Sequence, residues 1–307
     1  MTQLVELQRR LPDFEAAGMK IFAVSYDPQD GLAEFARTYG ITYDLLSDSD
    51  STVITRFGIL NTLIDPTEPD AEVFYGIPYP GTYIVDASGM VVRKYFNQHL
   101  ATRDAPERLL DEAGGQTVLS PDAPQQEHQD GDVRVCVFLP GGDLKIELTR
   151  QLYCRLDIRD GLHIYAEPVP SGFVATEVSV KEVSGLRIGK PVYPAATPLV
   201  MEELGLELPT WEGTVDIGIP ITATTELLNV LKPLDQKAIT LDLSVRYQSC
   251  STRECFLPRT VNLSLEVPLA QGIVPDLPPS LGRGLRVSSL QTGAYLAQLA
   301  ARRQEDS

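Results

Sequence analysis

Two cysteines, Cys250 and Cys255, are the residues of this chain whose type and spacing best fit a chemical role. Four residues separate them, which is the length of a hairpin loop. Residues 241–247 and 261–267 on either side alternate apolar and polar side chains, and this period of two predicts half-buried strands. Cross-strand partners hold their Cα atoms about 4.5–5.5 Å apart, a spacing that fits a disulfide. The pattern predicts a cysteine pair that can open and close without moving the fold, as a redox centre requires.

Stability alone explains this pair poorly. A loop this short gives a disulfide only about 2 kcal/mol of stabilisation, and a chain of 307 residues can bury one or two real cores without it. Within the loop, Arg253 would favour a thiolate and Glu254 would oppose one. Three interpretations stay open: an exchanging pair, which we favour, a static disulfide, and two unpaired thiols. The sequence does not show which cysteine attacks, and we provisionally assign that role to Cys250.

The other cysteines predict structural roles. Cys154 falls in the inward-facing set of its strand and is expected to be a buried core thiol. Cys136 is also assigned a structural role. The three histidines lie far apart and lack ligand spacing: His99, His128 and His163. We therefore predict no metal site and no cofactor.

The charge of the chain limits its partners. The formal net charge is -16 and the pI about 4.6, which argues against binding nucleic acid or an anionic membrane surface. No apolar run approaches the ~20 residues of a membrane span, and residues 1–6 open a helical pattern rather than a signal peptide. The sequence as written predicts a cytoplasmic protein, where a standing disulfide would be unusual.

Residues 1–114 read as alternating helices and strands, which predicts an α/β layer fold. A first helix should break at Pro12, and residues 20–25 have the pattern of a short buried strand. Asp27 and Pro28 should open a second helix, which Gly40 ends. The remaining expected elements are a helix starting near residue 50, a hairpin over 81–96 and a helix that buries Ala105, Leu109 and Leu110.

The residue composition and the hydrophobic periodicity of the chain change after residue 114. Residues 115–131 are rich in Gly, Pro, Gln, Asp and Ser without periodicity, which predicts a linker. Residues 132–269 show short strands between turns, typical of an all-β sandwich, with an irregular surface excursion over 191–212. Residues 270–307 form a tail with a terminal helix at about 288–302, expected to dock on its own chain, with docking on a partner as the alternative.

Several front segments carry a family resemblance: Thr2–Gln8, Ile21–Asp27, Phe57–Ile59 and Pro80–Asp86. Over residues 1 to about 112 they resemble the AhpC/TSA redoxin branch of the thioredoxin fold. The resemblance implies a thioredoxin-like α/β domain. It also implies that Pro80, followed by Gly81 and Thr82, matches a proline that in the family is often cis and lies beside the active cysteine. Without the resemblance, Pro80 is a loop proline entering a strand.

The front half departs from that family at its reactive centre. Family members carry the reactive cysteine, commonly in Cys-x-x-Cys, at the N-terminus of the helix that opens this chain, where the helix dipole lowers a thiol pKa. This sequence begins inside that helix and has no cysteine before Cys136. We expect either a misplaced or truncated start or a domain that has lost its own chemistry. As written, the chain should not reduce peroxides. An upstream Cys-x-x-Cys would restore that activity, and an export signal would change the localisation.

Two back segments, Gly161–Tyr165 and Tyr247–Pro258, carry a second resemblance. Over roughly residues 132 to 268 the chain resembles the immunoglobulin-like N-terminal domain of DsbD-type thiol:disulfide interchange proteins. The resemblance implies that the cysteine pair receives electrons from one thioredoxin-like domain and passes them to extracytoplasmic partners. The cysteine spacing is one residue tighter than the family's usual form, and the chain lacks the transmembrane conduit.

The sequence therefore predicts a two-domain thiol–disulfide redox protein. Its front is an N-terminally truncated redoxin module, and its back is a sandwich with Cys250 and Cys255 as the exchanging pair. Thioredoxin-like or other thiol/disulfide proteins are the expected partners. The alternative is an inactive binding module that recognises a partner through the groove beside Pro80, with a structural disulfide. A peroxiredoxin-type antioxidant enzyme is the third reading.

Overall fold

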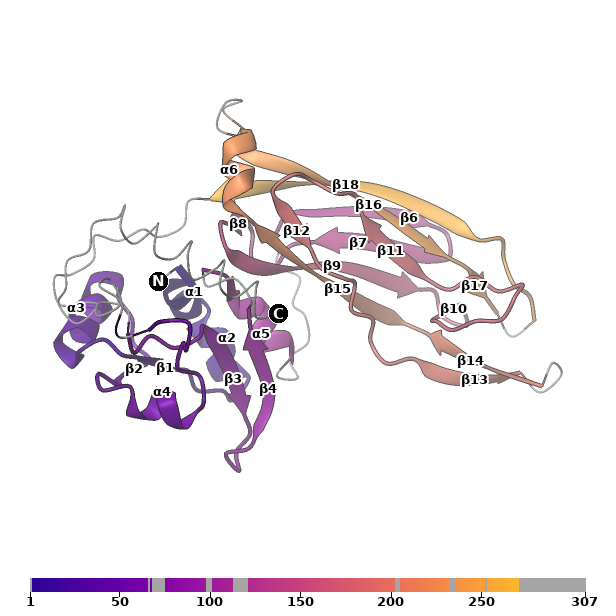
Figure 1. Cartoon of the computed structure of the whole chain (residues 1–307). Coiled ribbons are helices and arrows are strands. Elements are labelled where there is room, and N and C mark those ends of the chain that lie inside the picture. Colours follow the sequence, from indigo (N-terminus) through magenta and orange to yellow (C-terminus); the bar gives the residue numbers. More distant parts are fainter. Residues whose placement is uncertain are drawn as a thin grey trace. The chain divides into compact units, whose positions relative to one another are not determined.

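The computed structural model describes residues 2–65, 67, 75–97, 101–112, 121–201, 205–231, 236–251 and 253–270. The chain divides into two compact units, one within residues 1–115 and the other within residues 116–271. Figure 1 shows the α/β unit in indigo to magenta and the β-rich unit in magenta to yellow.

The α/β unit contains five helices and five strands in the described residues. The helices are α1 (Thr2–Arg9), α2 (Leu11–Ala16), α3 (Gln29–Tyr39), α4 (Thr52–Arg56) and α5 (Pro106–Glu112). The strands are β1 (Phe22–Ser25), β2 (Asp44–Ser47), β3 (Gly81–Val85), β4 (Val91–Phe96) and β5 (Arg103–Asp104). β1 pairs with β2 in parallel, and β3 pairs with β4 in an antiparallel hairpin.

Local sequence explains where these helices end. Pro12 occupies the first turn of α2, where its missing N–H is not needed, so the predicted break falls at Arg10. Gly40 closes α3 in the left-handed conformation at φ 65°, which glycine adopts without strain. The predicted start of α3 is wrong by one residue, because Pro28 rather than Asp27 holds the capping position.

The core of this unit lies between α1, α2, α3 and α5. Its buried members are Val5, Leu7, Phe14, Phe35, Ile41, Tyr43, Leu109 and Leu110. The prediction that residues 20–25 form a buried strand is wrong for one face, since Phe22 is 57% exposed and Val24 is 46% exposed. In the described part of the chain, β1 has a hydrogen-bonded neighbour on one side only, the strand β2.

The β-rich unit is built from three sheets. One sheet has the order β12-β15-β9-β7-β6, a second β11-β16-β18-β8, and a third β13-β14-β10-β17. The strands that precede β12 are β6 (Gln125–Asp130), β7 (Val133–Phe138), β8 (Leu144–Lys145), β9 (Leu148–Ile158), β10 (His163–Tyr165) and β11 (Glu177–Val180). The later elements are β12 (Leu186–Ile188), β13 (Thr197–Met201), β14 (Leu206–Trp211), β15 (Thr214–Ala223), α6 (Thr225–Leu231), β16 (Ala238–Tyr247), β17 (Ser249–Cys250) and β18 (Arg259–Ala270).

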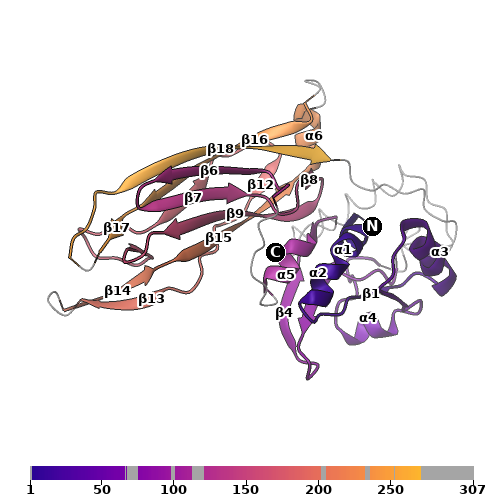
Figure 2. The same cartoon turned by 180° about the vertical axis from the view of Figure 1, so that it is seen from behind.

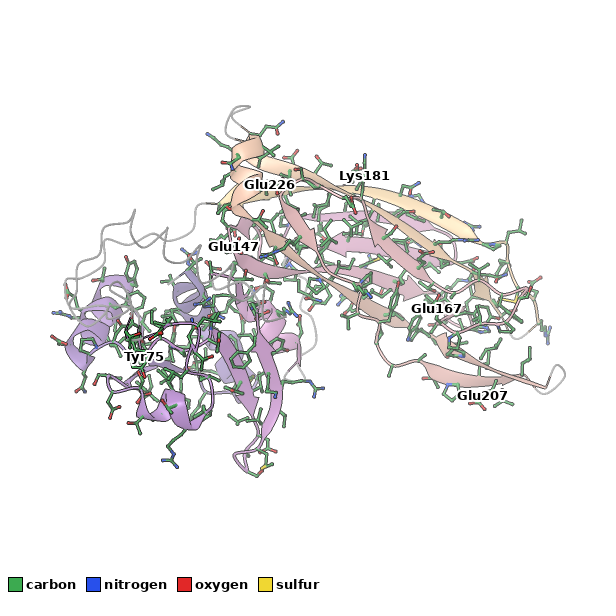
Figure 3. All side chains as sticks on the ribbon, viewed as in Figure 1. Tyr75, Glu147, Glu167, Lys181, Glu207 and Glu226 are labelled. Atoms are coloured by element: carbon green, nitrogen blue, oxygen red, sulfur yellow. A yellow bond between two sulfur atoms is a disulfide. The ribbon has the colours of Figure 1, made fainter. Side chains whose placement is uncertain are left out.

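The first two sheets enclose a single hydrophobic core. Strands β16 and β18 bury alternate residues, as the period of two predicts, whereas β9 of the other sheet is buried on both faces from Leu148 to Cys154. The fully buried side chains on β9 and β16 include Leu152, Cys154, Leu156, Leu241 and Val245. Charged side chains such as Lys181, Glu207 and Glu226 point outward (Figure 3). The predicted sandwich is confirmed.

Two irregular stretches predicted from sequence are strands in the structure. Residues 125–130, assigned to a linker, form β6 and pair with β7 along their whole length. Residues 191–212, assigned to a surface excursion, contain the β13–β14 hairpin. The two errors have different causes: β6 is a polar edge strand placed by its pairing with β7, and the β13–β14 hairpin contains Pro198 and Pro209, which argue against strands.

The third sheet forms the end of the unit opposite α6. Figure 1 shows β10, β13, β14 and β17 gathered there, and Figure 2 shows β13, β14 and β17 at the same end. His163 of β10 pairs with Cys250 of β17, and Ile164 of β10 pairs with Trp211 of β14. This small sheet positions the cysteine hairpin.

Candidate functional site

The predicted hairpin is confirmed by the pairing of β16 and β18, which runs in antiparallel register from Ala238 and Pro268 to Tyr247 and Arg259. Beyond Tyr247 the chain leaves that sheet, and β17 joins β10 instead. Cys250 and Cys255 then face each other as an antiparallel bridge. They form a disulfide, with their Cα atoms 4.1 Å apart. The interpretation as two unpaired thiols is therefore wrong for this structure.

The two cysteines differ strongly in solvent access. Cys250 is 0% exposed and packs with Tyr165 and Leu208, with Val169, Phe173 and Leu206 around them. Cys255 is exposed. Cys255 is therefore the residue of the pair that faces solvent, and Cys250 is the residue enclosed in the fold. This asymmetry favours Cys255 as the attacking residue, in place of the provisional assignment to Cys250.

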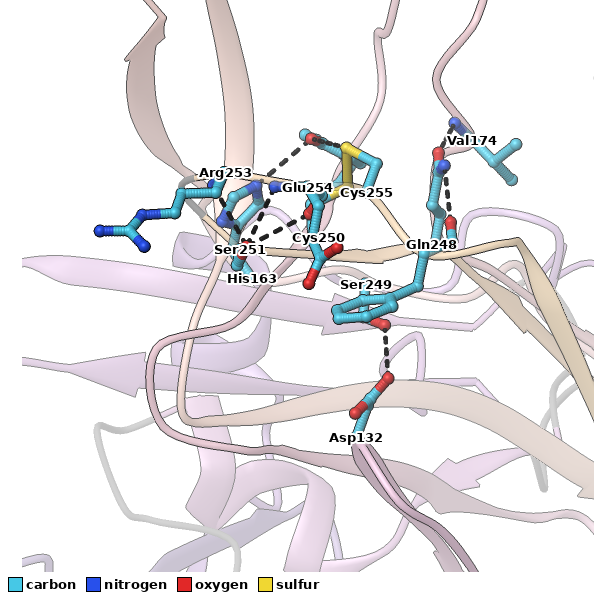
Figure 4. Close-up of a disulfide and its surroundings, with 12 residues drawn as sticks. Asp132, His163, Val174, Gln248, Ser249, Cys250, Ser251, Arg253, Glu254 and Cys255 are labelled. Atoms are coloured by element: carbon cyan, nitrogen blue, oxygen red, sulfur yellow. Dashed lines mark hydrogen bonds between the residues drawn. A yellow bond between two sulfur atoms is a disulfide. The ribbon is translucent and has the colours of Figure 1, made fainter.

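Two polar aromatic side chains of β10 lie against the disulfide. The Tyr165 hydroxyl is 3.5 Å from Cys255 Sγ and 3.3 Å from His163 Nε2. Both rings are buried, and they meet edge to face with centroids 5.2 Å apart. Because His163 and Tyr165 are two residues apart on one strand, their side chains share a face. Figure 4 shows the hydrogen bonds around the disulfide as dashed lines.

Burial sets the protonation of both groups. Desolvation raises the pKa of the Tyr165 hydroxyl, so the phenol keeps its proton. Desolvation also lowers the pKa of His163, against a weaker opposing effect of the Glu212 carboxylate. His163 is therefore a neutral imidazole at neutral pH, and one of its ring nitrogens can accept a hydrogen bond.

A glutamine side chain ties the cysteine hairpin to the neighbouring loop. Gln248 Nε2 donates to the Phe256 carbonyl at 3.0 Å, and Gln248 Oε1 accepts from the Val174 backbone N–H at 2.9 Å. The loop that carries Val174 also carries Phe173, whose ring packs against Tyr165 with centroids 5.2 Å apart. Gln248 therefore holds the hairpin and the loop that covers Tyr165 in one arrangement.

The hairpin turn is ordered by its own backbone contacts. The Ser251 N–H donates to the Glu254 carbonyl at 2.8 Å, and Ser251 Oγ accepts from the N–H groups of Arg253 and Glu254, each at 3.1 Å. Arg253 and Glu254 are both exposed. Figure 4 shows the Arg253 guanidinium directed away from the sulfurs. The predicted influence of these two charges on the thiolate stays a prediction.

The loop formed by Pro80, Gly81 and Thr82 belongs to the α/β unit, which contains no cysteine. Pro80 is buried at the start of β3, and the Phe96 ring packs so closely over Gly81 that an added Cβ would lie 2.2 Å from it. Thr82 is half-buried and pairs with Tyr95. The expectation of a cis bond at Pro80 is wrong, because the cis peptide among the described residues is at Glu167–Pro168. All four cysteines of the chain lie outside this unit.

Cys136 and Cys154 are structural, as predicted. Cys136 is 1% exposed and Cys154 is 0% exposed, on adjacent strands β7 and β9. Burial raises the pKa of Cys136, and it raises the pKa of Cys154 to about 12. Both thiols therefore stay protonated at neutral pH, and thiols rather than thiolates are poor nucleophiles.

Sequence reasoning missed three residues of the site: His163, Tyr165 and Gln248. The run Gly161–Tyr165 carries a family resemblance, but nothing in its pattern shows that it lies beside a hairpin about 85 residues later. Within the described residues no group of His, Cys, Asp and Glu is arranged to hold a metal ion. Nor does any described helix combine the length and apolar character that crossing a bilayer requires.

Comparison with known families accounts for both units. Residues 1–94 match the model of the AhpC/TSA family, and residues 144–266 match that of the N-terminal region of the thiol:disulfide interchange protein DsbD. The front of this chain is thus similar to an AhpC/TSA redoxin domain and its back to a DsbD N-terminal domain. The DsbD-type domain is the one that carries the disulfide, and the predicted resemblances of both halves are confirmed.

Individual relatives cover only parts of the chain. A candidate peroxiredoxin of Mycobacterium tuberculosis is 30% identical over 99 residues, which are 31% of this chain and 57% of that protein. The N-terminal periplasmic domain of ScsB from Proteus mirabilis is 14% identical with a TM-score of 0.32, over 50% of this chain and 49% of that one. The reduced DsbD N-terminal domain of Neisseria meningitidis is 14% identical with a TM-score of 0.27, over 49% of this chain and 91% of that one. The chain spans little more than half of the length of the curated relative.

Proposed function

We propose that this protein is a thiol–disulfide oxidoreductase whose exchanging pair is Cys250 and Cys255. The observation that carries the proposal is the exposed Cys255 sulfur bonded to a buried Cys250 in a braced hairpin. The family matches support it, since peroxiredoxin-like and DsbD-type proteins both work through thiols. Thioredoxin-like proteins are the proposed partners.

The proposed reaction has two steps. In the reduced protein, the Cys255 thiolate attacks a partner disulfide, forms a mixed disulfide and releases one partner thiolate. Cys250 then attacks the Cys255 sulfur, which closes the Cys250–Cys255 bond and releases the second partner thiolate. Two electrons and the two cysteine protons end on the partner, now a dithiol. A second, reducing dithiol returns the pair to its starting state by the reverse steps.

The reduction potential of the pair tests the proposal directly. Equilibration of the full chain in dithiothreitol or glutathione buffers, followed by thiol quantification, gives the value. We expect a potential between about -270 and -180 mV, the range of thioredoxin and protein disulfide isomerase. A potential below about -300 mV, which is typical of structural disulfides, would contradict exchange.

Single-cysteine variants test the order of attack. Cys250→Ser leaves the exposed Cys255 without its resolving partner, so it should form a stable mixed disulfide with an oxidised thioredoxin-fold protein. Cys255→Ser is the matched control, because it leaves only the buried thiol and should capture about tenfold less. Equal capture by both variants would contradict the assignment of Cys255 as the attacking cysteine, because that assignment rests on the burial of Cys250.

A docking role is the second candidate. It is favoured by a redoxin domain whose residues 1–115 contain no cysteine and which exposes apolar side chains, with Phe22 and Phe57 each 57% exposed. In that case the disulfide would be structural, and its potential would lie below about -300 mV. Peroxide-dependent oxidation of thiols would instead indicate peroxidase activity, which we do not expect from this chain.

A compartment outside the cytoplasm fits the proposed function better than the cytoplasm. Disulfides form and persist in the periplasm and other oxidising compartments, and the matched DsbD-type domain carries a formed disulfide here. Alkylation of free thiols in separated cell fractions would show where the oxidised protein resides.

A further inference from the structure

A continuous line of polar atoms connects the disulfide to a buried histidine. The Cys255 sulfur is 3.5 Å from the Tyr165 hydroxyl, and that hydroxyl is 3.3 Å from His163 Nε2. Tyr165 is 0% exposed and His163 is 3% exposed. A hydroxyl can accept one hydrogen bond while it donates another, so Tyr165 can pass a proton between the other two groups.

The surroundings of His163 act on an imidazolium in two directions, since desolvation by burial opposes it and the Glu212 carboxylate favours it. The titratable groups on β10 and on the strands paired with it are Tyr165 on β10, Glu212 directly after β14 and Cys250 on β17, while Arg253 and Glu254 follow in the exposed hairpin turn and Asp132 reaches β17 through Ser249. Asp132 is engaged by Arg159 at 3.1 Å and lies within hydrogen-bond distance of Ser249. Glu212 would stabilise an imidazolium.

We propose that His163 is a positioning residue that removes the proton of Cys255 through the Tyr165 hydroxyl. This inference rests on the proposed function, because it concerns the thiol that attacks. The Cys255 thiol gives its proton to the Tyr165 oxygen as the Tyr165 proton passes to His163 Nε2. The result is a Cys255 thiolate, an unchanged tyrosine and a His163 imidazolium. When the partner leaves as a thiolate, that proton is available to it, so no proton is left over.

A proton acceptor linked to the Cys255 thiol would raise its ionised fraction at neutral pH. The Cys255 sulfur contacts a buried phenol on one side, and Arg253 is directed away from it. A thiol of ordinary pKa, about 8.5, is only about 3% ionised at pH 7. A shift of one pKa unit towards the thiolate changes that fraction about tenfold.

Alkylation of the reduced full-length protein measures this effect without any partner. Iodoacetamide is applied from pH 5 to pH 10, and carbamidomethylation of Cys255 is followed by peptide mass spectrometry. The wild-type rate should show two ionisations with a shoulder near neutral pH. His163→Gln cannot hold the proton, so it should react about tenfold more slowly at pH 7 and match the wild type near pH 10.

Two further variants separate a relay from a packing role. Tyr165→Phe removes the hydroxyl but keeps the ring, and it should reproduce the His163→Gln profile, with no additional loss in the double variant. His128→Gln, at an exposed position on β6, is the matched control and should leave the profile unchanged. An unaltered pH profile in His163→Gln, or additive losses in the double variant, would overturn the relay. Neither result depends on the reduction potential that tests the proposed function.

Discussion

Replacement of Gln248 by alanine should loosen the cysteine hairpin. The variant loses both side-chain hydrogen bonds, one to the Phe256 carbonyl and one from the Val174 N–H. Each bond contributes about 1 kcal/mol net to stability, so the local arrangement should lose about 2 kcal/mol. A loss of 2 kcal/mol raises the population of locally opened molecules about 30-fold.

Hydrogen exchange at the Val174 amide measures this opening. In Gln248→Ala the exchange rate should rise about 30-fold, and reduction of the disulfide by dithiothreitol should accelerate because the loop no longer shields the site. Gln248→Glu retains an acceptor for Val174 but loses the donor to Phe256, so it should show about half of the free-energy loss. Gln129→Ala, on the exposed edge strand β6, is the control and should change neither rate. An unchanged exchange rate at Val174 in Gln248→Ala would refute the assigned role.

Three other predictions concern separate parts of the molecule. Leu257, beside the disulfide, is 85% exposed; Leu257→Ser should slow exchange with a thioredoxin-fold partner several-fold, while leaving the rate with a small aromatic disulfide unchanged. Gly81→Ala should push away the Phe96 ring, which packs 5.2 Å from Tyr83, and should lower the unfolding free energy of the α/β unit by about 1 kcal/mol in a urea titration. Burial raises the pKa of Cys154 to about 12, so native protein should leave this thiol unalkylated at pH 8 and react there only in denaturant; alkylation without denaturant would contradict the assignment.

The core strands of the β-rich unit were predictable because their side chains repeat with the period of the pleat. The runs 241–247 and 261–267 bury alternate residues, and the pairing of β16 with β18 follows from them. Cap residues also predicted where helices end when the backbone must adopt a left-handed conformation, as at Gly40, which closes α3.

Strands with polar or proline-containing sequences were not predictable. β6 has the polar sequence Gln-Gln-Glu-His-Gln-Asp, and its place in the sheet depends on β7. In the β13–β14 hairpin, Pro198 and Pro209 stand opposite each other in the register. Prolines are usually read as signals against strands, but this pairing requires no N–H from either residue.

The sequence by itself determined that Cys250 and Cys255 form a hairpin pair able to close a disulfide, because strand period and loop length are local properties. Only the tertiary structure decided that Cys255 is accessible and Cys250 is buried. It also decided that Tyr165 and His163 of β10 lie against the pair. Solvent access and side-chain contact arise when strands about 85 residues apart join one sheet, and no pattern within either segment records that meeting.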